Sequence, residues 1–261
     1  MVHHSKNIIQ SIESFFFLVG DISRFGSRFF REGFKSPIEW REIMRQSVEI
    51  GYRSLPLVGI TAFIMGLVLT IQSRPTLVEF GAESWLPAMV SVSIIREIGP
   101  VITALICAGK IGSRIGAELG SMKVTEQIDA MEVSGTNPFK YLVTTRILST
   151  TLMLPLLVIL ADVIALYGAY LGVNIKGAVS AQLYFNQVIE ALEFSDLIPS
   201  IVKSFFFGFA IGLIGCYMGY HSKKGTEGVG KSANSAVVIA SLMVFVLDLL
   251  AVQITDLFYE L

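Results

Sequence analysis

The chain has 261 residues, of which 53% are hydrophobic and only 16% are charged, and its formal net charge at pH 7 is −1. Its mean hydropathy is +0.66. Soluble domains carry about 25% charged residues. The composition therefore excludes a soluble globular protein and predicts an integral membrane protein.

The N-terminal region is predicted to contain an amphipathic helix at about residues 8–30. Charged residues within it, such as Glu13 and Arg24, exclude a signal peptide. A helix with one apolar and one polar face is typical of the membrane interface. Its apolar residues recur at helical spacing and are Ile8, Ile12, Phe15, Val19, Ile22, Phe25 and Phe29.

A second helix is predicted to begin at Ser36. The sequence Ser36-Pro37-Ile38-Glu39 has a Ser cap, a Pro in the first turn and a Glu three residues after the cap, which together form a capping box. This helix is expected to lead through Trp40 into the first membrane span.

Five segments are long and apolar enough to cross a hydrocarbon core of about 30 Å, which takes about 20 helical residues. Strand-like alternation is absent, so the predicted fold is an all-α membrane protein rather than a β-barrel. Glycine pairs such as Gly168 and Gly172 predict close packing between the spans. We divide the chain into an N-terminal interfacial region, 1–53, and a five-span domain, 54–261. The predicted spans lie near residues 54–73, 86–109, 146–174, 198–220 and 235–257.

Lys and Arg residues predict the orientation, because cytoplasmic loops are enriched in them. The N-terminal region and the connections before the third and fifth spans are basic. The other two connections contain Arg74 and Lys176 among several acidic residues. We therefore expect a cytoplasmic N-terminus and a periplasmic C-terminus. The basic residues on the expected cytoplasmic side are Lys6, Arg24, Arg28, Arg31, Lys35, Arg41, Arg45, Arg53, Lys110, Arg114, Lys123, Lys140, Arg146, Lys223, Lys224 and Lys231.

The polar segment at residues 118–138 is predicted to hold a short cytoplasmic helix at about 121–135. Thr125 is its candidate N-cap, Glu126 places negative charge at its N-terminus, and Gly135 ends it. Isolated helices shorter than about 12–15 residues are marginal in water. The helix between Thr125 and Gly135 would have only about ten residues and therefore needs a docking surface.

The same segment has an apolar stripe formed by Val124, Ile128 and Met131, beside the acidic residues Asp129 and Glu132. Two interpretations remain open from the pattern. The stripe fits a groove in a partner protein, or it lies on the membrane or on the surface of its own chain.

Residues 225–232, GTEGVGKS, match the phosphate-binding pattern G-x-x-x-x-G-K-[ST]. A working P-loop follows a β-strand of a nucleotide-binding sheet. Here the motif lies between two predicted spans, and no soluble segment is long enough for such a domain. We interpret it as a glycine-rich basic turn.

Charged residues also occur inside the predicted spans. Their positions place all of them in the outer half of the bilayer, where they are close enough in depth to meet around one site. A centrally placed charge costs about 2.5–3.5 kcal/mol on insertion scales, so such residues usually pair or face a wet cavity. Either they form ion pairs that only fix packing, or they line a cavity that receives an anionic head group. They are Arg96, Glu97, Asp162, Lys203 and Asp248.

Two stretches resemble a known family. The run REIGPVITALICAGKIGSRIGAELGSMKVTEQIDAMEVSGTNPFKYLV, Arg96 to Val143, resembles the signature region of the MlaE/YrbE family. The later GTEGVGKSANSAVV, Gly225 to Val238, resembles the second recurring segment of that family. Members of this family are permease subunits of bacterial ABC transporters that move phospholipids between membranes.

The resemblance implies roles for particular residues. The segment matching Glu118–Gly135 is the family's coupling helix, which docks into the ATPase subunit, and the positions matching Glu97, Lys203 and Asp248 lie near the family's lipid path. Further lipid-lining candidates, chosen by position, are Leu69, Gln72, Leu77 and Phe80. The predicted coupling residues are Val124, Glu126, Ile128, Asp129, Met131 and Glu132.

The resemblance also implies partners. We expect a permease homodimer in the bacterial inner membrane, a separate ATPase subunit that binds ATP and Mg²⁺, an MCE-domain protein at the outer face, and in some systems a STAS-domain subunit. The outer connections at about 74–85 and 175–197 are where the MCE protein is expected to rest. Phospholipid is the expected substrate, with no nucleic-acid partner and no cofactor in this chain.

The sequence contains no pattern of a nucleophile with a base and no metal cluster, so we expect this polypeptide not to be an enzyme. One alternative is kept. An ion-coupled secondary transporter would use Glu97, Asp162 and Asp248 as relays and would need no ATPase.

Overall fold

The computed structural model describes residues 2–33, 35, 38–175, 177, 179–223 and 225–259. These residues form helices with short connections, and no strand occurs among them. Some predictions fall outside the described parts of the chain. They concern the capping residues Ser36 and Pro37, the basic residues Lys176 and Lys224, and the side chains of Lys6, Ile8, Ile12 and Phe15.

The five predicted spans are confirmed. Five helical segments are long and apolar enough to cross a membrane, and each contains one of the predicted spans. All five extend beyond the predicted limits, because the helices continue through polar residues at their ends. They run over Trp40–Glu79, Glu83–Val124, Phe139–Asn174, Phe194–Tyr220 and Thr226–Leu257.

Three of these segments are uninterrupted α-helices: α2 (Trp40–Glu79), α9 (Phe194–Tyr220) and α10 (Thr226–Tyr259). The third span is the π-helical η4 (Phe139–Thr144) followed by α7 (Thr145–Asn174). The second span is composite and begins with the 3₁₀ turn η1. Its elements are η1 (Glu83–Trp85), α3 (Leu86–Ser93), η2 (Ile94–Ile98), α4 (Gly99–Cys107), η3 (Ala108–Gly112) and α5 (Ser113–Val124), of which η2 and η3 are π-helical.

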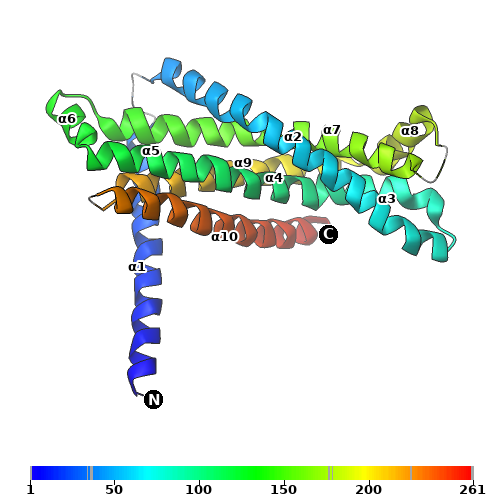
Figure 1. Ribbon diagram of the computed structural model, residues 1–261, viewed down its shortest axis with the longest axis horizontal. Helices are drawn as coiled ribbons and strands as arrows, with labels where there is room; N and C mark the ends of the chain where they lie inside the picture. The colour runs from blue at the N-terminus through cyan, green and yellow to red at the C-terminus, as the bar shows by residue number, and fades with distance from the viewer. Residues whose placement is uncertain are drawn as a thin grey trace.

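Figure 1 shows the spans as an elongated bundle with a short helix at each end. One end carries α6 (Gln127–Val133), and we call it the α6 end. The opposite end carries α8 (Ala181–Ala191), and we call it the α8 end. The turn between α9 and α10 also lies at the α6 end (Figure 1).

Close backbone contacts hold the bundle together. A Cβ atom added to Gly168 of α7 would overlap the carbonyl oxygen of Phe63 on α2, and one added to Gly66 would overlap that of Ala165. Small residues at such positions let helix backbones approach in lipid, where no hydrophobic force favours helix over lipid contact. The predicted packing role of Gly168 is confirmed.

The N-terminal helix α1 (Val2–Glu32) runs at a steep angle to the spans and leaves the bundle at the α6 end (Figure 1). The predicted helix is confirmed, but the C-terminal part of its apolar face packs on the protein. Phe25 is 6% exposed and its ring lies 5.0 Å from that of Phe139 and 5.6 Å from that of Tyr217. Phe17 of the same helix is 69% exposed.

The end of α1 is also fixed by polar contacts. Arg28 pairs with Glu32 at 2.9 Å, and its guanidinium carbon lies 4.3 Å above the Phe139 ring. Burial opposes ionisation of Glu32, but hydrogen bonds from Arg28 and Asn137 outweigh it and hold the pKa of that carboxyl below its usual range. These contacts tie α1 to the start of the third span.

Candidate functional site

Lys203 of α9 lies between two carboxylates from different spans. Its Nζ is 2.6 Å from Oε2 of Glu97 on η2 and 2.9 Å from Oδ1 of Asp248 on α10. The Lys203 side chain is only 5% exposed, whereas those of Glu97 and Asp248 are 39% and 20% exposed. Three of the five predicted intramembrane charges are therefore brought together, and we call them the Lys203 cluster.

The backbone of η2 explains how Glu97 reaches this position. A π turn holds one extra residue and is frequent at functional sites. Pro100 follows two residues after η2 and has no N–H, so it cannot donate the α-helical hydrogen bond to the carbonyl of Arg96. The local sequence thus favours an irregular turn at the point where the Glu97 side chain projects from the second span.

Arg96 is adjacent in sequence but faces another partner. Its Nη2 lies 3.5 Å from Oδ1 of Asp256, and both side chains are exposed, at 44% and 56%. The prediction that all five charges meet around one site is wrong for Arg96, because adjacent helical residues point in directions about 100° apart. Asp256 was not among the predicted site residues, because a charge in the last turns of α10 is not unusual at the end of a span.

Asp162 of α7 is buried, at 8% exposure. Its Oδ1 has no hydrogen-bond partner within the described chain, and it occupies the space where a Cβ on Gly99 would stand. Asp162 therefore packs against the backbone directly after η2 rather than forming an ion pair with Lys203. It supports the π turn from the α7 side.

An apolar cavity of about 250 Å³ lies between α9 and α10 beside the Lys203 cluster. Lys203 and Thr255 are its polar members. A cavity of this size holds part of a lipid, such as a segment of one acyl chain, rather than a whole molecule. The apolar lining residues are Pro199, Val202, Phe206, Phe207, Leu247, Leu250, Ala251 and Ile254.

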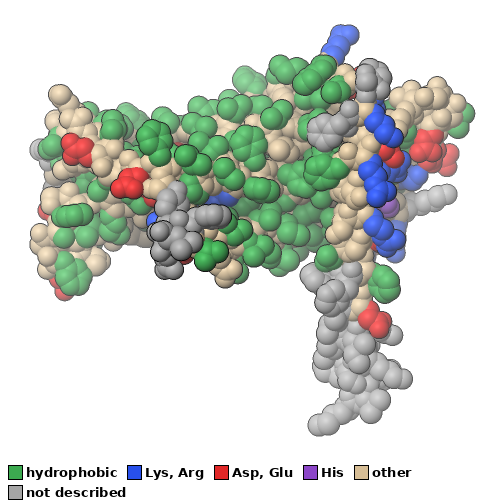
Figure 2. Space-filling model, turned by 180° about the vertical axis from the view of Figure 1, so that it is seen from behind, with side chains coloured by type: hydrophobic (Ala, Val, Ile, Leu, Met, Phe, Trp, Pro, Cys, Tyr) green, Lys and Arg blue, Asp and Glu red, His purple; other side chains and the backbone are tan. Residues whose placement is uncertain are grey.

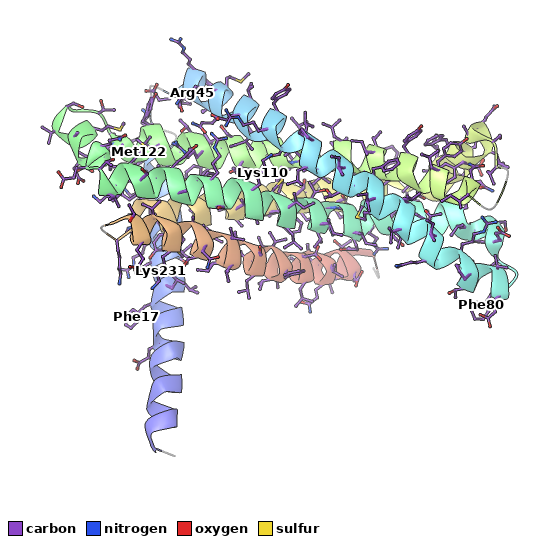
Figure 3. The ribbon with its side chains drawn as sticks, viewed as in Figure 1. Phe17, Arg45, Phe80, Lys110, Met122 and Lys231 are labelled. Atoms are coloured by element: carbon purple, nitrogen blue, oxygen red, sulfur yellow. The ribbon has the colours of Figure 1, made fainter. Side chains whose placement is uncertain are left out.

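The four lipid-lining candidates on or just after α2 do not line this cavity. Leu69 and Leu77 are partly buried against the bundle core, and Gln72 is exposed. Phe80 is 78% exposed and lies just beyond α2 at the α8 end (Figure 3). The cavity that the structure contains was missed, because pairing of α9 with α10 is not readable from either span alone.

The short helix at the α6 end is confirmed, but its predicted start is wrong. Thr125 is the C-cap of α5, and its Oγ1 donates to the carbonyl of Ser121 at 2.8 Å, so its hydroxyl does not cap the next helix. Glu126 occupies the N-cap position in the left-handed conformation, with φ of 59°. The resulting helix α6 has 7 residues instead of the expected ten or so.

The apolar stripe of this segment does not face outward. Val124 belongs to α5, Met131 is partly buried, and Ile128 is 1% exposed within the core of its own chain. The alternative that the stripe lies on its own protein therefore holds for Ile128. Lys123 bonds Asp129 at 2.7 Å and closes the turn between α5 and α6.

The outward surface of α6 is acidic with one apolar residue. Glu126, Asp129 and Glu132 are exposed, and Val133 is 90% exposed. Val133 was not predicted because it lies off the stripe. We call Glu126, Glu132 and Val133 the α6 surface.

A chain of ion pairs joins three spans at the α6 end. Arg114 of α5 contacts Glu49 of α2 at 2.6 Å and Glu118 at 2.7 Å. Glu118 in turn contacts Arg146 of α7 at 3.3 Å. From the sequence, these arginines were used only to predict the orientation in the membrane. Their pairing couples the helix that leads into α6 to the spans on both sides.

Most of the segment that matches the P-loop pattern is helical. Residues 226–232 form the first turns of α10, so their backbone N–H groups do not line a loop around phosphates. The Ser232 hydroxyl, moreover, donates to the carbonyl of Val229 at 2.9 Å and lies 3.3 Å from that of Gly116. The motif therefore lacks the loop geometry of a P-loop, but the interpretation as a glycine-rich turn is wrong for residues 226–232, because they belong to α10.

Comparison with known proteins gives a family. The family model described as Permease MlaE matches residues 43–254, from the start of α2 to near the end of α10. The chain belongs to the MlaE permease family.

Several curated relatives resemble this MlaE-family permease over most of its length. A probable ABC transporter permease protein of Rickettsia typhi is 41% identical over 226 residues, covering 87% of this chain and 86% of the relative. One from Synechocystis is 33% identical, covering 93% and 90%. The chloroplast protein TRIGALACTOSYLDIACYLGLYCEROL 1 of Arabidopsis thaliana is 32% identical, covering 82% and 61%. The chain is thus an ABC transporter permease subunit of the MlaE family.

Replacement of Lys203 by Met is expected to destabilise the permease by about 3 kcal/mol, because it leaves two carboxylates uncompensated inside the spans. Further replacement of Glu97 by Gln and Asp248 by Asn removes those charges and should restore most of the loss. The thermal unfolding midpoint of the purified protein measures both effects. A triple variant as unstable as Lys203→Met would show that the charges do not account for the loss.

Gly99→Ala is expected to destabilise the second span by about 1–3 kcal/mol, because the new Cβ overlaps Oδ1 of Asp162. Gly109→Ala is the matched control, since a Cβ at Gly109 meets nothing within 4 Å. Thermal unfolding of the two variants should separate them. Equal midpoints would mean that Asp162 does not rest against Gly99.

Proposed function

We propose that this permease subunit moves phospholipids between membranes, together with an MCE-domain protein and a separate ATPase subunit. The Lys203 cluster beside an apolar cavity carries this proposal. Within the described chain, Lys203 uses two of its three N–H donors on carboxylates. The third donor is available to an oxygen of a lipid head group, while the cavity accepts an apolar chain.

The class of ligand follows from this pairing of chemistries. A purely polar substrate gains nothing from an apolar lining, and a purely apolar one gains nothing from a buried ammonium. A phospholipid has both groups. In support, the name of the Arabidopsis relative includes a glycolipid, trigalactosyldiacylglycerol.

The ATPase is proposed to dock on the α6 surface and to hold ATP and Mg²⁺ itself. Glu126 and Glu132 offer carboxylates to a basic groove, and Val133 offers an apolar anchor. Because Ile128 is buried beneath α6, a force on this surface is transmitted to α5 rather than lost in a flexible loop. From α5 the ion pairs of Arg114 and Glu118 reach α2 and α7.

The remaining parts of the proposal concern placement and assembly. Lys and Arg side chains gather at the α6 end, while hydrophobic side chains cover most of the face between the ends (Figure 2). This supports an inner-membrane protein with the α6 end in the cytoplasm. At the α8 end, Phe80, Trp85 and Phe194 are 69–80% exposed and suit an MCE partner. We further propose a permease homodimer, with a STAS-domain subunit in some systems.

An ion-coupled transporter is disfavoured by the same geometry. Two of its required relays, Glu97 and Asp248, are both bonded to Lys203 and not to a further titratable group that could pass an ion on within the described chain. Asp162 alone, without a chain of exchanging groups, does not form a relay. The ABC mechanism needs no such relay.

The lipid proposal is tested by filling the cavity. Leu250→Trp places a larger side chain into the lining and should lower the phospholipid bound per purified permease by half or more. Leu156→Trp adds the same side chain to a position on α7 that is 51% exposed and outside the lining, and should leave binding unchanged. Phosphorus analysis of extracted lipid measures the result. Equal lipid content in both variants would refute a lipid site here.

Docking on the α6 surface is tested by charge reversal. Glu126→Lys with Glu132→Lys should lower co-purification of the ATPase subunit at least tenfold, because like charges then face its groove. Glu79→Lys with Glu190→Lys reverses two acidic residues near the α8 end and is the matched control. Asp129 is left unchanged because it pairs with Lys123. Undiminished ATPase recovery with the first pair would exclude this surface.

A further inference from the structure

A second hollow lies at the α6 end, where α9 turns into α10. Its volume is about 380 Å³, and its polar lining includes His221, Lys223, Glu227, Lys231, Ser232 and Ser235. It is separate from the cavity beside Lys203, and the two share no residue. The proposed transport mechanism assigns it no role.

The charges of this lining favour an anion. Neither Lys223 nor Lys231 has a carboxylate within ion-pair distance anywhere in the described chain, whereas Arg53, Arg114 and Arg146 at the same end are all paired. Among the described residues of the lining, Glu227 is the only acidic group, so the two lysines leave a net positive charge. Lysine ammonium groups of this kind bind phosphate oxygens well. The Ser235 hydroxyl adds a donor.

The depth of the hollow follows from its contact with α1. The His221 ring lies 5.6 Å from that of Phe25 on α1, and its Nδ1 donates a 3.0 Å hydrogen bond to the carbonyl of Tyr217. Lys231 lies near the start of α10, at the level where α1 leaves the bundle (Figure 3). An amphipathic helix at a steep angle to the spans marks the membrane surface. The hollow thus lies where lipid head groups lie.

An apolar surface continues from the hollow along α10. Val238, Leu242, Phe245 and Leu249 are 54–60% exposed and recur every three or four residues, beginning one turn after Ser235. The stripe spans about 16 Å at about 1.5 Å per residue. One leaflet of a hydrocarbon core is about 15 Å thick, half of about 30 Å. The stripe therefore matches the length of one leaflet's acyl chains.

We propose that this hollow binds the head-group phosphate of an anionic phospholipid in the leaflet at the α6 end, with its acyl chains along the α10 stripe. The net positive lining selects an anionic lipid over a zwitterionic one. The site holds a resident lipid and is independent of the lipid proposed to occupy the cavity beside Lys203. A free phosphate lacks the acyl chains that the stripe accepts.

The test uses the delipidated full-length permease in detergent and native mass spectrometry with added phosphatidylglycerol or phosphatidylethanolamine. The wild type should retain phosphatidylglycerol more strongly. Lys223→Gln with Lys231→Gln should weaken that binding by about fivefold for each lysine lost. Lys140→Gln, another cation at the α6 end but outside the lining, should have no effect. Size-exclusion chromatography confirms that each variant remains folded.

Three results would overturn the proposal. The first is equal phosphatidylglycerol binding by the wild type and the double variant. The second is no preference for phosphatidylglycerol while inorganic phosphate or ATP binds in a Lys231-dependent way, which assigns the hollow to a soluble anion. The third is loss of ATPase binding, rather than of lipid, in the double variant. Leu250→Trp distinguishes the two lipid sites, since it fills the cavity beside Lys203 and should leave phosphatidylglycerol retention here intact.

Discussion

The hydrocarbon core offers no water to a charged group, so each charge within the spans must be compensated by the protein itself. Lys203 meets this constraint by drawing Glu97 and Asp248 toward one ammonium. Three spans are thereby joined at one depth, and the irregular turn η2 and the contact of Asp162 with Gly99 serve to place Glu97 there. The adjoining cavity between α9 and α10 combines an apolar lining with a charged group, because Lys203 of this cluster is one of its lining residues.

The charged residues at the α6 end differ from the Lys203 cluster, because they lie near the end of the bundle and not within the apolar part of the spans. Here arginines and glutamates from α2, α5 and α7 form a continuous chain of ion pairs. Surface ion pairs contribute little stability singly, but this chain spans three helices directly below α6. The ion pairs therefore connect α5, which leads into α6, to α2 and α7. Lys223 and Lys231 in the hollow at the same end differ from these residues, because neither has an ion-pair partner among the described residues.

The sequence was sufficient for the parts of the fold that depend on composition and periodicity. Five spans, the helix α1 and the convergence of Glu97, Lys203 and Asp248 were all predictable, since length, amphipathicity and depth decide them. The capping of α6 was not, because the Thr125 hydroxyl could accept from a backbone N–H of the next helix or donate to a carbonyl of the preceding one, and the bond to Ser121 within α5 prevailed. The direction of Arg96, the burial of Ile128 and the α9–α10 cavity depend on tertiary packing, which no single segment encodes.

The length of α2 has a consequence for the shape of the permease outside the lipid. Its 40 residues form a rod of about 60 Å, twice the thickness of about 30 Å that a hydrocarbon core presents. Tilt alone absorbs only part of this difference, so the rod overhangs the bilayer. Phe80 follows its last residue at the α8 end and is 78% exposed. The ends of α2 therefore present protein surface beyond the hydrocarbon core.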